Sequence, residues 1–165
     1  MKIIWYLLKC PEGSESDYTE RCRELVSWDG LQEIVCFQYQ RMMRYGGDWH
    51  LERRMLLPGH IFLSGIGTVS WKESNAKSVF LSPSEYPYPR EMCRWGNLIR
   101  MSGGIIKNGI LIVTSGPLKG REKLIRRIDR HKRTAEIEIP LGTDKKRVTV
   151  GLEIYEKMTK AKDKS

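Results

Sequence analysis

The segment NGILIVTSGPLKGREKLIRRIDRHKRTAEIEI, residues 108–139, is the most informative about the fold of the carboxy-terminal part of the chain. Its run from Ile110 to Val113 is typical of a short strand, and Ser115-Gly116-Pro117 predicts the turn that ends it. Gly120 closes that turn. The last segment, TAEIEI at 134–139, alternates polar and apolar residues, which predicts a strand with one buried face. The whole stretch therefore indicates a small β-module.

Cations gather between this turn and the last strand, and only Glu122 and Asp129 offset them. Most charge runs are simply solvated surface, and that alternative stays open here. Leu124, Ile125 and Ile128 anchor the segment to a core, however, so the charges are displayed on ordered structure. We interpret the segment as a nucleic-acid-binding surface. Its predicted RNA contacts are Lys119, Arg121, Arg126, Arg127, Arg130, His131, Lys132 and Arg133.

The charge of the chain is unevenly distributed. At 165 residues the sequence suits one ordinary domain or two small ones, and its net charge is +9. Residues 1–103 hold 13 Lys and Arg against 12 Asp and Glu, whereas residues 104–165 hold 16 against 8. This asymmetry predicts that the second part binds an anionic polymer and that the first part does something else.

Several classes of function lack their sequence signatures. The apolar run at the start, MKIIWYLLK, is too short for a signal sequence or a membrane helix, so we expect a cytoplasmic protein. Four cysteines without a CxxC pair predict buried thiols, not a zinc site or a disulfide framework. We find no phosphate-binding glycine loop and no nucleophile motif. We therefore expect no catalytic activity, no metal and no cofactor.

The amino-terminal part combines strands and helices. A continuous apolar run, Ile3 to Leu8, predicts a central strand, and Ser14 or Ser16 is the predicted cap of a helix that Gly30 ends. The segments 34–45 and 49–57, joined through Gly46-Gly47-Asp48, predict a hairpin.

A second helix is predicted after Pro89, with Met92, Trp95, Leu98 and Ile99 on one apolar stripe. Ser102-Gly103-Gly104 is predicted to end this helix and to begin a linker. The lysine-rich tail from Lys157 is expected to be disordered.

Two groups of these residues resemble a known family. Gly109, VTSGPLKG at 113–120, IDRHKRTA at 128–135 and VGLEI at 150–154 look like the KOW motif region of NusG-type transcription factors. The pair Trp5-Tyr6, followed by Leu57-Pro58-Gly59-His60, resembles the pattern of the NusG amino-terminal domain. In that pattern Leu57 stands in place of a phenylalanine and His60 in place of a tyrosine. Within the family, the sequence is most similar to specialised paralogs of the LoaP type.

The resemblance implies an α+β fold in two domains. Residues 1–103 would form an antiparallel sheet flanked by helices. Residues 104–165 would hold the linker, a small SH3-like β-barrel (KOW) domain over about 106–157, and the basic tail.

The resemblance also implies the partners. The first domain would bind RNA polymerase through Trp5, Tyr6, His60 and Phe62. The second would bind an RNA hairpin in a nascent leader transcript, with non-template DNA as a further candidate. The expected function is operon-specific transcription antitermination by a monomer. The alternatives are a general NusG-like elongation factor, a KOW-containing protein that binds ribosomal RNA, and an adaptor that recruits another protein through its barrel.

Overall fold

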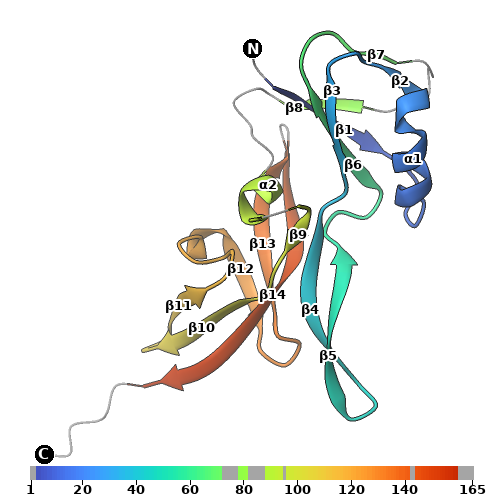
Figure 1. Ribbon diagram of the computed structural model, residues 1–165. Coiled ribbons are helices and arrows are strands. Elements are labelled where there is room, and N and C mark those ends of the chain that lie inside the picture. The colour runs from blue at the N-terminus through green and yellow to red at the C-terminus, as the bar shows by residue number, and fades with distance from the viewer. Residues whose placement is uncertain (1–2, 72–77, 82–87, 95, 142–143, 160–165) are drawn as a thin grey trace, which may run out of the picture.

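The computed structural model describes residues 3–71, 78–81, 88–94, 96–141 and 144–159, and these form a mixed α+β fold made mostly of strands (Figure 1). Trp95 of the predicted second helix and residues 160–165 of the basic tail lie outside the described residues. The elements of the amino-terminal unit are β1 (Ile4–Lys9), α1 (Glu15–Leu25), β2 (Val26–Ser27), β3 (Leu31–Val35), β4 (Gln38–Tyr45), β5 (Asp48–Met55), β6 (His60–Gly65), β7 (Ser70–Trp71), β8 (Ser78–Leu81), α2 (Tyr88–Met92) and β9 (Leu98–Ile99). Those of the carboxy-terminal unit are β10 (Ser102–Lys107), β11 (Ile110–Ser115), the 3-10 helix η1 (Glu122–Leu124), β12 (Ile125–Asp129), β13 (Thr134–Leu141) and β14 (Asp144–Met158).

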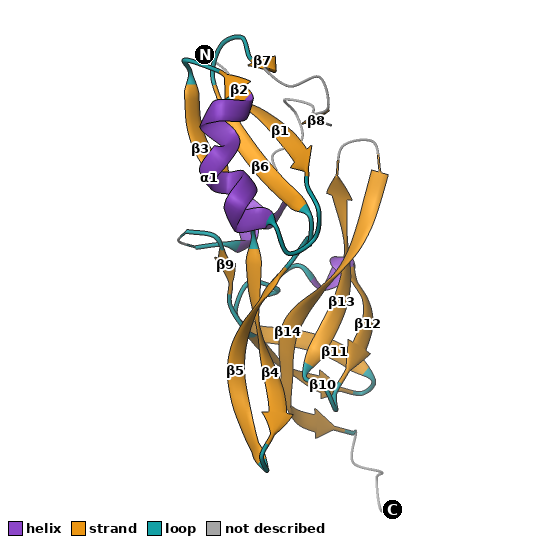
Figure 2. Ribbon diagram, turned by 90° about the vertical axis from the view of Figure 1, so that its right-hand side faces the viewer, coloured by secondary structure: helices purple, strands orange, loops and turns teal. Residues whose placement is uncertain are grey.

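The first sheet has the strand order β3-β6-β1-β8, and its neighbouring strands are antiparallel. Helix α1 lies across one face of this sheet (Figure 2). The cluster on this face includes Leu8, Cys22, Ile61 and Leu63. Ser14 occupies the N-cap position as predicted, but its side chain makes no capping hydrogen bond. The helix ends at Leu25, five residues before the predicted stop at Gly30.

A long hairpin of β4 and β5 extends away from this sheet and runs beside the carboxy-terminal unit (Figure 1). Its turn is the predicted Gly46-Gly47, and both glycines have positive φ, which side-chain-bearing residues rarely adopt. The hairpin predicted from the sequence is thereby confirmed, except that its first strand is interrupted. Cys36 and Phe37 separate β3 from β4, and the two strands belong to different sheets.

The carboxy-terminal unit is a five-stranded sheet of order β11-β10-β14-β13-β12. β13 shows the predicted alternation, with Ala135, Ile137 and Ile139 buried. The sheet is not the closed barrel expected from the resemblance, because its edge strands β11 and β12 are not paired with each other in the described residues. Strand β11 is tied to η1 by a side chain: Glu122 accepts a hydrogen bond from the backbone N–H of Val113 at 3.2 Å.

The second half of the amino-terminal unit differs most from the sequence prediction. Helix α2 ends at Met92, and the predicted helical residues Leu98 and Ile99 form β9, which pairs with β4. Gly103 and Gly104 belong to β10 and not to a linker. A side chain on Gly104 would collide with the backbone of Ile112, so the glycine permits close approach of β11.

One hydrophobic cluster joins the two units. It includes Phe37 and Ile99 of the amino-terminal unit together with Ile137 and Val150 of the carboxy-terminal unit. The backbones also approach closely, since a Cβ on Gly151 of β14 would meet the carbonyl oxygen of Gln40 in β4. The two units predicted from the sequence therefore pack against each other.

Candidate nucleic-acid interface

The cationic turn between β12 and β13, residues 130–133, is held by backbone contacts. Asp129 accepts a hydrogen bond from the backbone N–H of Lys132 at 2.9 Å, and Leu152 N–H donates to the carbonyl of Arg133 at 3.0 Å. The hydrogen bond from the Lys132 amide lowers the pKa of Asp129. Burial raises this pKa by less than the hydrogen bond lowers it, and the positive charges of Lys132 and Arg127 lower it further. Asp129 therefore stays ionised, and the turn presents its side chains from a fixed backbone.

Most of the predicted RNA contacts are exposed, but they do not form a single group. Those at the β12–β13 end are Arg127, Arg130, His131 and Lys132, all exposed. Lys119 and Arg121 precede η1 and so lie at the other end of β12. Arg121 donates to the carbonyl of Pro117 at 2.8 Å, and Arg126 pairs with Glu138 at 3.1 Å. The exposed group that is free to meet a ligand is therefore the one around the β12–β13 turn.

Arg133 is engaged within the protein. Its guanidinium lies 3.9 Å from the ring centroid of Trp49, on β5, and also pairs with Glu153 at 3.1 Å. Its φ of 54° places it in the left-handed region, which turns the chain into β13. This cation–π contact connects the β4–β5 hairpin to the cationic turn.

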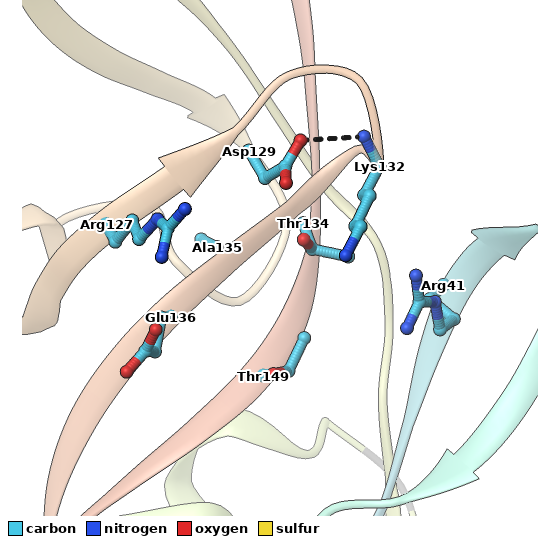
Figure 3. Close-up of a pocket in the computed structure, with 8 residues that line it drawn as sticks. All are labelled: Arg41, Arg127, Asp129, Lys132, Thr134, Ala135, Glu136 and Thr149. Carbon is cyan, nitrogen blue, oxygen red and sulfur yellow. Dashed lines mark hydrogen bonds between the residues drawn. The ribbon is translucent and has the colours of Figure 1, made fainter.

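The β4–β5 hairpin adds residues that the sequence analysis did not assign to a site. Tyr45 and His50 stack with ring centroids 3.8 Å apart, and Arg44 lies 6.0 Å from the centroid of Trp49. Arg41 points from β4 toward Lys132 and Thr134 (Figure 3). The arginine-rich composition of the hairpin was the only sign in the sequence that it belongs to the site. Its position beside the turn could not be predicted, because it depends on contacts between residues more than 80 positions apart in the chain.

The four predicted polymerase-binding residues do not lie on one exposed surface. Trp5 and Phe62 are 6% and 0% exposed and belong to the hydrophobic cluster shared by both units. Tyr6 lies on the opposite face of the sheet, where its ring meets Trp28 edge-on at 5.6 Å. His60 is half-buried, and its Nδ1 lies 2.9 Å from the carbonyl oxygen of Pro58.

The turn that carries His60 is tied to the start of α1. The carboxylate of Glu15 accepts hydrogen bonds from Gly59 N–H at 2.7 Å and from Gly13 N–H at 3.2 Å. Gly59 has a φ of 76°, and a side chain there would also meet the carbonyl of Cys10. The Pro58-Gly59 segment thus has a structural role in this fold.

The cysteines are free thiols, but the prediction that all four are buried is only half right. Cys22 and Cys93 are buried, and burial raises the pKa of each to about 11. Cys10 and Cys36 are half-buried, because they lie at the rim of the cluster under α1. Across the part of the chain that the structure describes, no group of three or more His, Cys, Asp or Glu side chains could hold a metal ion. None of the described helices is long and apolar enough to cross a membrane.

A scan of the chain against models of protein families found no match. A search of curated proteins likewise returned no similar sequence. The likeness of its motifs to the NusG family therefore remains a prediction.

Proposed function

We propose that this protein is a transcription factor of the NusG type, similar to the LoaP-type paralogs, that binds structured RNA through its carboxy-terminal unit and RNA polymerase through its amino-terminal unit. The five-stranded carboxy-terminal sheet would be an open version of the SH3-like KOW module. The observation that carries the proposal is a group of exposed basic side chains, with Arg127 on β12 and Arg130, His131 and Lys132 on the ordered turn that follows it.

Folded RNA is the ligand that suits this group best. A-form RNA has a deep, narrow major groove that hides base edges, so proteins recognise it by its shape and its phosphates. A turn with a fixed backbone and several cations can match the phosphate spacing of such a helix. Arginine forks can bind phosphate oxygens bidentately, and a protonated histidine adds a charge.

The polymerase contact is proposed on the first sheet around His60, the first residue of β6. Of the four residues named for this role, His60 and Tyr6 retain exposed surface, whereas Trp5 and Phe62 support the fold around them. Replacing His60 by Ala should therefore weaken polymerase binding without unfolding the protein. Replacing Phe62 should primarily reduce stability.

The RNA proposal is tested by the salt dependence of binding. Removing one cation that meets a phosphate should reduce the slope of log affinity against log salt by about 0.7 to 0.9. We expect the double substitution Arg130→Gln and Lys132→Gln to flatten the slope for an RNA hairpin. The control, Lys145→Gln with Lys146→Gln, removes the same charge from exposed positions of β14. No salt-dependent affinity in the wild-type protein, or equal slopes in both variants, would contradict the proposal.

One observation favours a second function, the recruitment of a protein partner. Ile110 and Ile112 on the edge strand β11 are 66% and 41% exposed, which is the apolar surface an adaptor would need. If this surface serves a protein partner, replacing both residues by Ser should abolish capture of that partner and leave RNA affinity unchanged. A loss of RNA affinity in this variant would instead assign the surface to RNA.

A further inference from the structure

A polar pocket lies where β4 meets the carboxy-terminal sheet, and its volume is about 200 Å³. Figure 3 shows three cationic side chains directed into it from different elements: Arg41 from β4, Arg127 from β12 and Lys132 from the cationic turn. The hydroxyl-bearing residues Thr134 and Thr149 complete the wall. Since one water occupies about 30 Å³ in the liquid, there is room for a phosphate group with a few waters.

The charges around the pocket leave it positive. It is lined by two acids, Asp129 and Glu136. Glu136 is paired outside the pocket with Arg147 at 3.4 Å, so their charges offset each other. Asp129 offsets one of the three cations and uses an oxygen to hold the Lys132 amide. Two positive charges therefore remain without an anionic counterpart among the lining residues.

Arg41 has an unused donor in this environment. Its Nε is buried, and no hydrogen-bond partner meets it anywhere in the described ranges of the chain. Buried polar groups in proteins nearly always have a partner. A bound oxyanion would supply one, because a guanidinium can present Nε and a terminal nitrogen to two oxygens of the same group.

We propose that this pocket binds a phosphate group, with Arg41, Arg127 and Lys132 as its ligands. The proposal rests on the proposed RNA-binding function in one respect: the phosphate is taken to be a phosphodiester of the RNA backbone. Since Arg41 belongs to the amino-terminal unit and the other two ligands to the carboxy-terminal unit, the bound phosphate bridges the units. RNA binding then stabilises their packed arrangement, and the amino-terminal hairpin contributes to RNA affinity.

The first test follows the Nε–Hε resonance of Arg41 by NMR in the full-length protein, assigned by its absence from the Arg41→Gln spectrum. We expect this resonance to shift in a saturable way as inorganic phosphate is added. An RNA hairpin should shift the same resonance and reduce the response to phosphate. If neither phosphate nor RNA shifts this resonance, the pocket is not an anion-binding site. A resonance that responds to phosphate but not to a hairpin that binds would limit the site to free anions and overturn the RNA assignment.

The second test compares variants in their affinity for the hairpin. Arg41→Gln should weaken binding about tenfold or more, the usual effect of removing charge-assisted hydrogen bonds, and Arg41→Lys should fall between this variant and the wild type. Arg53→Gln is the matched control, because it removes the same charge from an exposed position on the same hairpin. Equal weakening by Arg41→Gln and Arg53→Gln would show that only the overall charge matters, and this would overturn the proposal.

The two tests separate this inference from the proposed function. If the wild-type protein has no affinity for structured RNA, the proposed function fails, and the phosphate titration of Arg41 alone decides whether the pocket is an anion site. If RNA binds with the expected salt dependence but Arg41→Gln binds it as the wild type does, the function stands and the pocket assignment fails.

Discussion

Among single residues, Glu15 holds the Pro58-Gly59 turn to the start of α1, although the two segments are more than 40 positions apart in the sequence. Its side chain is at the start of α1, and the residue is only 5% exposed. Burial alone would raise the pKa of this carboxyl, but the backbone amides of Gly59, of Glu15 itself and of Gly13 outweigh it, and the pKa is lowered. The ionised carboxylate thus fixes the Pro58-Gly59 turn to the helix.

We predict that Glu15→Ala lowers the free energy of unfolding by about 1 to 3 kcal/mol, because the buried Gly59 amide loses its acceptor. Glu15→Gln keeps an acceptor oxygen and should cost less. The folded pKa lies below the ordinary value of 4.5, so the contribution of ionised Glu15 is present above pH 4.5 and is lost as pH falls through the folded pKa. Urea unfolding at neutral and acidic pH measures both effects. Wild-type stability in Glu15→Ala would contradict this role.

At the scale of elements, the central contact is that of the β4–β5 hairpin with β14. A Cβ at Gly151 would collide with the backbone of Gln40 and with the sulfur of Met101. The hairpin can therefore lie against β14 only because this position has no side chain. Farther along, the contact of Arg133 with Trp49 holds the hairpin to the cationic turn.

We predict that Gly151→Ala separates the hairpin from β14 and lowers the free energy of unfolding by about 1 to 3 kcal/mol, the usual cost of overpacking. Gly103→Ala is the control. The three atoms nearest to its Cβ would all belong to the side chain of Tyr155, which is exposed and can move away. Thermal unfolding of the two variants gives the comparison. If Gly103→Ala proves as destabilising as Gly151→Ala, close packing against β4 does not explain the glycine.

Short sequence patterns predicted the elements whose conformation depends mainly on neighbouring residues in the chain. The β4–β5 hairpin follows from its glycine turn, and β13 follows from its alternation. The prediction was wrong for Leu98 and Ile99, which have helical spacing after Pro89. Helix α2 already ends at Met92, Gly96 follows with a φ of 67° that a helix does not allow, and pairing with β4 makes Leu98 and Ile99 a strand. Contacts between distant segments decided that outcome.

One part of the candidate site could likewise be predicted from the sequence, and another part could not. The cations of the β12–β13 turn could be identified in the sequence because they are consecutive. The contribution of Arg41 could not, since it depends on how a hairpin more than 80 residues earlier in the chain packs against the turn. The burial of Trp5 and Phe62 could not be predicted from the sequence either, because an aromatic residue in a strand carries no local sign of which face of the sheet it occupies.

At the scale of the whole molecule, the shared hydrophobic cluster should make the two units unfold together. All five tryptophans precede residue 104, so tryptophan fluorescence reports on the amino-terminal unit. The amide resonances of Val148 and Val150 report on the carboxy-terminal unit. We predict coincident urea transitions by both probes, as two-state unfolding requires. Separate midpoints would show that the units are independently stable.

We propose that the protein promotes transcription through terminators in response to a structured RNA. The most direct measurement is readthrough of a terminator by purified RNA polymerase, on templates with and without a leader sequence that forms an RNA hairpin bound by the protein. We predict that the protein raises readthrough when the hairpin is present, and that Arg130→Gln with Lys132→Gln abolishes the increase. Equal readthrough on both templates, or none on either, would show that the protein is not an RNA-dependent antiterminator.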